Sequence, residues 1–176
     1  MRTRRAELHD AKAIHQLIES FTHDGTLLRR SYLEICENIS TFTVAETETN
    51  QFLGCAALHL YGTHLAEIRS IVVRPDIAGN GAGTRLLQDL LTQADQAEIP
   101  CVCLFTRIPT FFSRFHFRVA ERRLLQDKVK KDCQNCARRN ACDETAMVIG
   151  EIPAYSALPF IPLRDHVPND LVQLQL

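Results

Sequence analysis

A glycine-rich turn between a predicted strand and a predicted helix is the feature that most constrains how this chain can fold. Gly79, Gly81 and Gly83 are three of its seven glycines, and they follow the strand-forming run AEIRSIVV at residues 66–73. After the turn, apolar residues recur at helical spacing, at Leu86, Leu87, Leu90, Leu91 and Ala94. Glycine lets backbone N–H groups come close to a ligand, and a helix start adds unpaired donors and a partial positive charge. We therefore expect a phosphate or pyrophosphate site at this turn.

The spacing within GNGAGT, residues 79–84, excludes two familiar phosphate motifs. No Gly-Lys-Ser/Thr closes the turn as a P-loop requires, and G-x-G-x-G is not the dinucleotide fingerprint. Five predicted elements precede the strand that leads into the turn, whereas a dinucleotide-binding fold would normally open with that strand. The alternative is an ordinary turn with a glycine cap, which the strand before it and the helix after it disfavour.

Elsewhere in the chain, the residue pattern predicts strands that alternate with helices. Strands are expected at residues 3–8, 41–46, 52–61, 66–73, 101–106, 117–121 and 144–152. Helices are expected at residues 10–21, 31–38 and 109–115, in addition to the helix that follows the glycine turn. This order indicates an α/β or α+β fold around a single mixed sheet.

Length and composition predict one domain with an appendage. A chain of 176 residues fits one domain over residues 1–150, followed by a proline-rich C-terminal tail over residues 151–176. This tail has no clear periodicity, so it is either disordered or an extended arm on a partner subunit, in which case the protein would be a homodimer.

Charge and hydropathy narrow the classes of partner. The net charge of −1 gives no support for nucleic acid or a membrane surface as a partner, because such partners usually require a basic excess. No apolar run approaches a membrane span, and the N-terminal MRTRRAELHD lacks the apolar stretch of a signal peptide. These features indicate a cytoplasmic protein.

Three of the seven cysteines cluster in a polar stretch near the C-terminus. Cys133, Cys136 and Cys142 form C-x-x-C-x5-C, and its first part has the spacing of metal ligands. Zinc normally takes four ligands, so a structural zinc site would need a fourth ligand from Asp143, His116 or His166. We favour the alternative, a loop with free or packed thiols, and assign no metal.

The region SIVVRPDIAGNGAGTRLL, residues 70–87, resembles the acetyl-CoA signature of the GNAT acyltransferases. The resemblance implies a GNAT fold, in which helices flank a central mixed, mostly antiparallel sheet, and it implies acetyl-CoA as the cosubstrate. The backbone of the strand would pair with the pantetheine arm, which Ile71 and Val73 would face. The pyrophosphate would be held by the loop residues Gly79, Asn80, Gly81, Ala82, Gly83 and Thr84.

Further segments narrow the resemblance to one branch of that family. GTLLRRS, FTVAE, GCAALHLY, AEIRSIVV and KDCQNCARRNACDETAM together resemble the acetyltransferase domain of N-acetylglutamate synthase in its short bacterial form, over roughly residues 2–149. This implies a small-molecule substrate, with acetyl transferred to the α-amino group of L-glutamate in the first step of arginine biosynthesis.

The acceptor site is expected to combine arginines with a carboxylate. Glutamate carries two carboxylates, which call for arginine side chains. The resemblance implies that Arg29 holds the substrate carboxylate, and Arg69 and Arg107 are further candidates. An amine must lose a proton before it attacks, and Glu67 is the counterpart of the family's proposed base, which acts through water.

The later steps of the transfer need two more groups. A backbone amide near Val72 or Val73 could stabilise the charge on the acetyl oxygen in the tetrahedral intermediate. Thr106 matches the family's Ser/Thr at the proposed acid position. A hydroxyl is a poor acid, so we expect Thr106 to orient a proton donor toward the leaving thiolate. For each of these polar residues, an ordinary surface or salt-bridging role is the alternative.

Two other functions remain open at this stage. The chain could be a GNAT enzyme that acetylates another small amine or a protein amine, because the fold alone does not select the acceptor. It could also be an inert module that binds CoA or an amino acid and regulates a partner. Binding of CoA without turnover would identify the second case.

Overall fold

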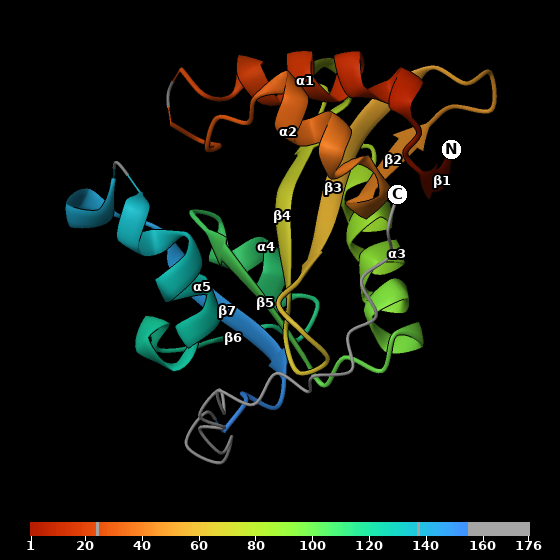
Figure 1. The fold of residues 1–176 in the computed structure, drawn as a ribbon. Coiled ribbons are helices and arrows are strands. Elements are labelled where there is room, and N and C mark those ends of the chain that lie inside the picture. Colours follow the sequence, from red (N-terminus) through yellow and green to blue (C-terminus); the bar gives the residue numbers. More distant parts are fainter. Residues whose placement is uncertain (24, 137, 155–176) are drawn as a thin grey trace, which may run out of the picture.

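The computed structural model describes residues 1–23, 25–136 and 138–154. Its strands are β1 (Arg2–Arg5), β2 (Phe42–Glu46), β3 (Phe52–Leu60), β4 (Ala66–Val73), β5 (Cys101–Thr106), β6 (Arg118–Val119) and β7 (Thr145–Gly150). Its α-helices are α1 (Ala11–Ser20), α2 (Tyr32–Glu37), α3 (Ala82–Gln96), α4 (Pro109–Ser113) and α5 (Gln126–Lys131). The strands form one sheet in the order β1-β2-β3-β4-β5-β7-β6 (Figure 1). Among the strands of the described residues, only β4 and β5 pair in parallel, which confirms the predicted mixed and mostly antiparallel sheet.

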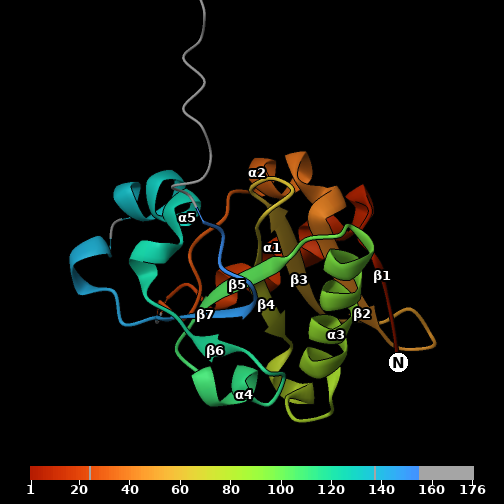
Figure 2. The same cartoon turned by 90° about the horizontal axis from the view of Figure 1, so that it is seen from below.

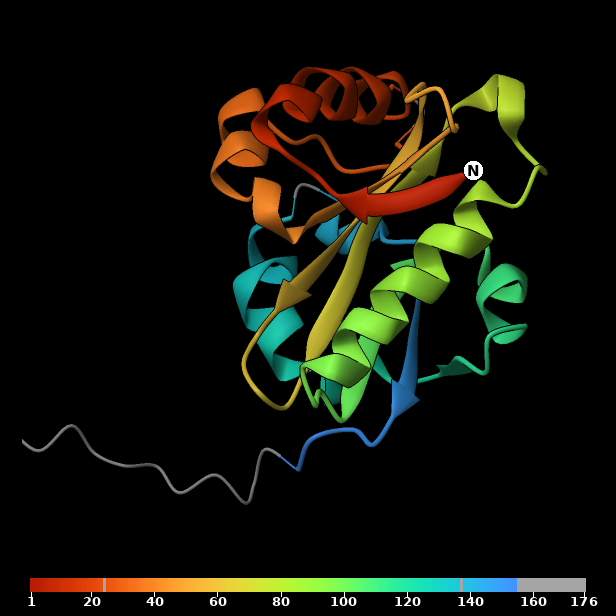
Figure 3. The same cartoon turned by 90° about the vertical axis from the view of Figure 1, so that its right-hand side faces the viewer.

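Alternating residues of the central strands face two separate apolar cores. Val44 and Cys55 lie on the face that packs against α1 and α2. Their neighbours Ala45 and Ala56 lie on the opposite face, in the cluster that includes the leucines of α3. Figure 3 shows α3 lying across the strands, with α1 and α2 at the top of the view. The amphipathic pattern of α3 in the sequence therefore corresponds to a real buried face, with Leu90 fully buried.

The two parallel strands stay together for only two residue pairs. Ala66 pairs with Val102 and Glu67 with Cys103, and beyond these pairs β4 and β5 diverge (Figure 1). On its far side β5 pairs with β7 along its whole length, from Cys101 to Thr106. The divergence therefore opens the sheet between its two halves, and Glu67 lies where the split begins.

β4 is also irregular on its β3 side. Cys55 pairs with Val72 and Ala57 with Arg69, so two residues of β4 oppose a single residue of β3. Ser70 lies in this bulge and has the left-handed φ of 53°. A bulge increases the local twist of a strand, so β4 turns away from β5 at this level.

Local hydrogen bonds set where the first strand ends and where α2 begins. The predicted strand at 3–8 is shorter, because the Asp10 carboxylate accepts hydrogen bonds from the Glu7 N–H and from Arg4, and a 3-10 turn forms from Leu8. α2 lies within the predicted helix at 31–38 and begins after Ser31, whose hydroxyl oxygen accepts from the backbone N–H of the third helical residue at 3.1 Å.

The segment between β6 and β7 contains a helix that the sequence pattern did not predict. α5 and its flanking 3-10 turns lie on the opposite side of the molecule from α3 (Figure 2). α5 has only six residues, and three of them are lysines, so it lacks the apolar period that identifies a helix. Lys128 is nevertheless its one buried residue.

The structure describes only the first residues of the predicted C-terminal tail. β7 ends at Gly150, and most of the predicted tail over 151–176 lies outside the described residues. The division into a domain and a tail therefore stays a prediction. No helix within the described ranges is long and apolar enough to cross a membrane.

Candidate active site

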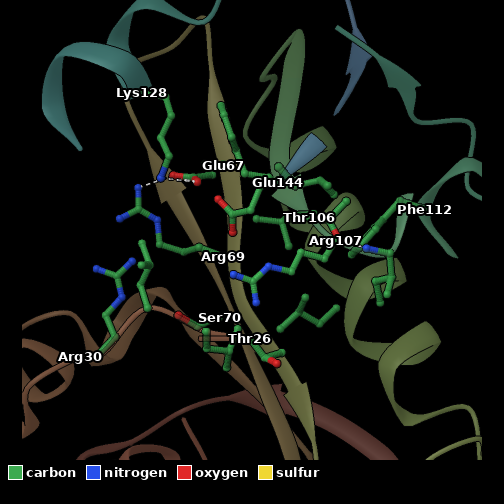
Figure 4. Close-up of a pocket in the computed structure, with 17 residues that line it drawn as sticks. Thr26, Arg30, Glu67, Arg69, Ser70, Thr106, Arg107, Phe112, Lys128 and Glu144 are labelled. Atoms are coloured by element: carbon green, nitrogen blue, oxygen red, sulfur yellow. Dashed lines mark hydrogen bonds and ion pairs between the residues drawn. The ribbon is translucent and has the colours of Figure 1, made fainter. Parts of the chain in front are cut away.

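A cavity of about 170 Å3 occupies the split between β4 and β5. Its apolar wall includes Ile71 from β4, Leu104 from β5 and Phe112 from α4. Its polar lining, shown in Figure 4, consists of Thr26, Arg30, Glu67, Arg69, Ser70, Thr106, Arg107, Lys128 and Glu144. The structure therefore brings together four of the predicted acceptor-site residues, namely Glu67, Arg69, Thr106 and Arg107.

Glu67 is held by three partners at the closed end of the split. It is only 2% exposed. One carboxylate oxygen lies 2.7 Å from Lys128 Nζ, and the other accepts from Arg69 at 2.5 Å and from the Tyr61 hydroxyl at 2.8 Å. Asp132 completes the network, since its Oδ2 lies 2.9 Å from Lys128 Nζ and 3.2 Å from the Tyr61 hydroxyl. Removing one partner from such a buried group typically costs about 3–5 kcal/mol, because a charge is left uncompensated.

The network also fixes the protonation of its members. Burial alone would lower the pKa of Lys128, but Glu67 and Asp132 outweigh it and raise that pKa, so the ammonium is retained. Burial, followed by the charge of Glu67, raises the pKa of Tyr61 well above its usual range. Burial would raise the pKa of Asp132, yet Lys128 and Arg69 lower it. Tyr61 is therefore a hydrogen-bond donor at neutral pH, and Asp132 is an acceptor.

Three arginines line the cavity and keep donors available. Arg69 Nε is buried and has no hydrogen-bond partner among the described residues. Arg30 donates to Glu34 through one terminal nitrogen at 2.5 Å. Arg107 donates to Asp143 through Nε at 2.9 Å. Each guanidinium has five N–H donors, so each can still bind a carboxylate.

The structure places Arg29 differently from its neighbour Arg30. Arg29 pairs with Glu19 on α1, its side chain is 71% exposed, and it is not among the residues that line the cavity. Arg30 lies inside, with a side chain that is 19% exposed. The role predicted for Arg29 stays a prediction, and Arg30 is the arginine of this pair that reaches the cavity.

Arg30 and Arg69 also border a second cavity of about 220 Å3. Its lining includes His59 of β3, Lys131 at the end of α5 and Asp132 directly after that helix. His59 lies opposite Glu67 in the β3–β4 register, and its Nε2 lies 2.8 Å from Lys131 Nζ. Arg69 therefore separates two polar spaces on either side of the central strand.

Thr106 ends β5 on the wall of the main cavity. It is 7% exposed, and its hydroxyl oxygen accepts a hydrogen bond from the Ile108 N–H at 3.0 Å. That bond orients the hydroxyl oxygen but leaves its hydrogen free to be donated. The position agrees with an orienting role near a leaving group, which stays a prediction.

The glycine turn and the start of α3 form an open backbone surface beside the split. Gly79 and Gly81 have φ of 88° and 83°, and Gly81 caps α3, which begins at Ala82. An added Cβ at either glycine would meet nothing within 4 Å, so the backbone conformation, and not crowding, requires glycine. The predicted loop residues Asn80, Gly83 and Thr84 belong to the same turn and the first turn of the helix. The N–H groups of that first turn have no partner within the helix, as an anion site requires.

The predicted cosubstrate residues of β4 divide between the two faces of the sheet. Ile71 and Val73 are partly buried against the α3 core, and Ile71 lines the cavity. Val72 is buried on the other face, in the α1 core. Their backbone lies beyond the last β4–β5 pair, at Glu67, so β5 does not occupy this edge of the strand.

The cysteine-rich turn lies beside the active site. Cys133, Cys136 and Cys142 border a small cavity of about 30 Å3 next to Lys128. Within the described ranges, no group of three or more histidine, cysteine, aspartate or glutamate side chains is arranged to hold a metal ion. His166, one of the candidate fourth ligands, lies outside these ranges.

Sequence reasoning missed several polar residues of this site. Tyr61, Lys128, Asp132 and Glu144 carried no motif of their own. The spacing of Lys128 and Asp132 by four residues was a usable signal, since these positions share a helix face and can form an ion pair. Tyr61 and Glu144 become site residues only through strand register.

The chain belongs to the acetyltransferase (GNAT) family. The model of that family matches residues 9–115, which include β4, the glycine turn and α3. Family membership, the diverging strands and the open helix start together define an acyltransferase.

Curated relatives connect the chain to amino-acid acetyltransferases. An uncharacterized N-acetyltransferase of Chlorobaculum tepidum is 36% identical over 82% of this chain and 93% of its own length. The amino-acid acetyltransferase of Mycobacterium tuberculosis is 32% identical over 67% of this chain and 68% of its own length.

Solved structures agree with this placement. A Mycobacterium tuberculosis protein in complex with CoA and NLQ superposes with a TM-score of 0.76 and 26% identity, over 86% of this chain and 99% of the other. N-acetylglutamate synthase of Neisseria gonorrhoeae, complexed with coenzyme A and N-acetyl-glutamate, gives a TM-score of 0.73 and 26% identity. The match covers 85% of this chain but only 34% of the Neisseria chain.

We expect His59 to reduce the stability of the protein as the pH falls from about 6.5 to about 4. Burial, followed by the positive charges of Arg69 and Lys131, lowers the pKa of His59 from 6.5 to about 4. Between these values the unfolded chain binds a proton at this histidine and the folded protein does not, so added acid favours unfolding. Urea unfolding across this pH range should show a shallower loss of stability in His59→Gln.

His23→Gln is the matched control, because His23 is exposed. Its loss of stability on acidification should follow the wild type. If the free energy of unfolding of His59→Gln fell with pH as steeply as that of the wild type, His59 would not contribute to the loss of stability in acid.

Proposed function

We propose that the protein transfers the acetyl group of acetyl-CoA to the α-amino group of L-glutamate. The observation that carries the proposal is the set of three arginines, Arg30, Arg69 and Arg107, around the cavity where β4 and β5 diverge. Their spare donors suit a small acceptor with two carboxylates. The buried Arg69 Nε supports this most directly, since a buried donor without a partner costs about 1–3 kcal/mol until a ligand satisfies it.

The proposed site for acetyl-CoA combines β4 with the glycine turn. The amides at the start of α3 would hold the pyrophosphate, and the free edge of β4 beyond Glu67 would pair with the pantetheine arm. The thioester would then lie at the split, next to Thr106. The CoA-bound neighbours and the family support this arrangement.

In the proposed reaction, the neutral amine attacks the carbonyl carbon of the thioester. Glu67 takes a proton from the ammonium through water, since its carboxylate lies at the closed end of the cavity. A backbone amide near Val72 or Val73 stabilises the oxyanion. The attacking nitrogen then loses its extra proton to water as the C–S bond breaks, and the thiolate of CoA receives a proton from a donor that Thr106 orients. The products are N-acetylglutamate and CoA.

The relatives give independent support for an amino acid as the acceptor. The Mycobacterium relative is an amino-acid acetyltransferase, and the Neisseria structure is an N-acetylglutamate synthase with N-acetyl-glutamate bound. A role in arginine biosynthesis and a cytoplasmic location are part of this proposal, because they follow from the same substrate.

Thiol release from acetyl-CoA tests the proposal directly. The purified protein would be assayed with glutamate, glutamine, aspartate and a lysine peptide. We expect saturable release with glutamate and weaker release with the others. Release with another amine alone would retain the acetyltransferase but refute glutamate. CoA binding without release by any acceptor would support an inert binding module instead.

Replacing Arg30 and Arg29 separately should show which of the two holds the substrate. Arg30→Ala is expected to raise the KM for glutamate about tenfold or more, as loss of a charge-assisted hydrogen bond predicts. Arg29→Ala should have a smaller effect, since Arg29 is exposed and pairs with Glu19. Neither change should alter the KM for acetyl-CoA. A larger effect in Arg29→Ala would confirm the role that the family resemblance implies for it.

Replacing Glu67 by Gln should lower kcat by about 10²–10⁴-fold, the usual contribution of a positioned base. The amide keeps the size of the side chain but cannot take the proton. Steady-state kinetics would measure the change, and the Kd for CoA should stay near that of the wild type. An unchanged kcat would exclude Glu67 as the base.

A further inference from the structure

Charge is nearly balanced around the main cavity. Its four cationic side chains each have a carboxylate partner. Arg30 pairs with Glu34 and Arg107 with Asp143, whereas Arg69 and Lys128 share Glu67 and Asp132. These four carboxylates offset the four cations.

Glu144 is a fifth carboxylate at this cavity, and it is not one of the four that pair with the cations. It lines the same cavity, and among the described residues its side chain forms no ion pair within 4 Å. Its one side-chain hydrogen bond in that part of the chain is with the Cys142 thiol, whose Sγ lies 3.8 Å from Oε2. The Arg122 guanidinium lies near enough to interact electrostatically with this carboxylate but does not pair with it. The carboxylate therefore has room for a positively charged ligand group as a direct partner.

Backbone contacts hold Glu144 in place. It directly precedes β7, where Thr145 pairs with Thr106 of β5. The Arg122 guanidinium donates to the backbone carbonyl of Glu144 at 3.0 Å, and not to its carboxylate. In Figure 4 the Glu144 side chain projects into the cavity between Glu67 and Arg107. The carboxylate is therefore presented to the space next to Thr106, where the reacting groups would meet.

We propose that Glu144 binds the ammonium group of the acceptor and positions it for reaction. This inference rests on the proposed function only in that the cavity takes an amine. The carboxylate of Glu67 already accepts from three donors, so it is less available to bind an ammonium group than the carboxylate of Glu144. The acceptor then lies with its nitrogen toward Glu144 and its carboxylates toward the arginines. The deprotonation and acyl transfer proceed as above.

The test compares an amino acid with its deamino analogue. Calorimetric titration in the presence of CoA would give the Kd of glutamate and of glutarate, which differ by the amino group. The wild type should bind glutamate about tenfold or more tightly than glutarate, as a charge-assisted contact predicts. In Glu144→Gln the ratio should fall to about one, while Glu144→Asp should retain part of it.

Glu37→Gln serves as the control, since Glu37 is exposed on α2 and lies outside both cavities. Its Kd ratio should equal that of the wild type. Unchanged CoA binding and circular dichroism would show that Glu144→Gln is folded, and Glu144→Ser replaces it if it is not. A merely structural role would weaken both ligands equally and leave the ratio unchanged.

The outcomes separate this inference from the proposed function. The role of Glu144 is overturned if folded Glu144→Gln still binds the amino acid more tightly than its deamino analogue. It is also overturned if the wild type binds every amino acid and its deamino analogue equally well. If glutamate does not bind, the same comparison is made with glutamine and lysine against their deamino analogues. Loss of discrimination for one of those pairs would support Glu144 and refute glutamate as the acceptor.

Discussion

The divergence of β4 from β5 is the constraint on which the active site depends. The strands pair in parallel at only two positions, and the bulge at Ser70 turns β4 away beyond them. A closed sheet would fill this space with backbone hydrogen bonds. The split instead exposes strand edges to a ligand, while the cores on both faces keep the two halves of the sheet in place.

Where two strands separate, the backbone N–H and C=O groups on their facing edges lose their partners. The buried ion-pair network around Glu67 closes the end of the split at which β4 and β5 still pair. Lys128 and Asp132 come from the α5 segment, whereas Glu67 and Arg69 come from the central strand. Because buried charges are tolerated only when they are paired, α5 must dock here for the fold to be stable. The same docking brings the cysteine-rich turn next to the site.

The sequence predicted the fold better than the site. The strands AEIRSIVV and CVCLFT were predicted with the bounds that the structure has, since CVCLFT is almost entirely apolar and AEIRSIVV is nearly continuous in apolar residues towards its end. The glycine turn was predicted from local chemistry alone. α5 could not be predicted from its pattern, because its stability comes from one buried lysine and its ion pairs and not from an apolar face. The sequence also could not distinguish Arg29 from Arg30. These two adjacent arginines of a connector have the same side chain, but Arg29 is exposed and Arg30 is largely buried.

By itself, the sequence determined the order of the strands and of the helices other than α5, the glycine turn at the start of α3 and the membership of the acetyltransferase family. These properties are local, since they depend on residue periodicity and on glycine at particular positions. Only the tertiary structure decided which polar side chains share the cavity. Glu67, Lys128 and Glu144 come from distant parts of the chain. They meet because β4 neighbours β5, β5 neighbours β7 and α5 docks its Lys128 on Glu67. Charge compensation is a property of that arrangement. The lack of an ion-pair partner for Glu144 among the described residues could therefore be recognised only after its neighbours were known.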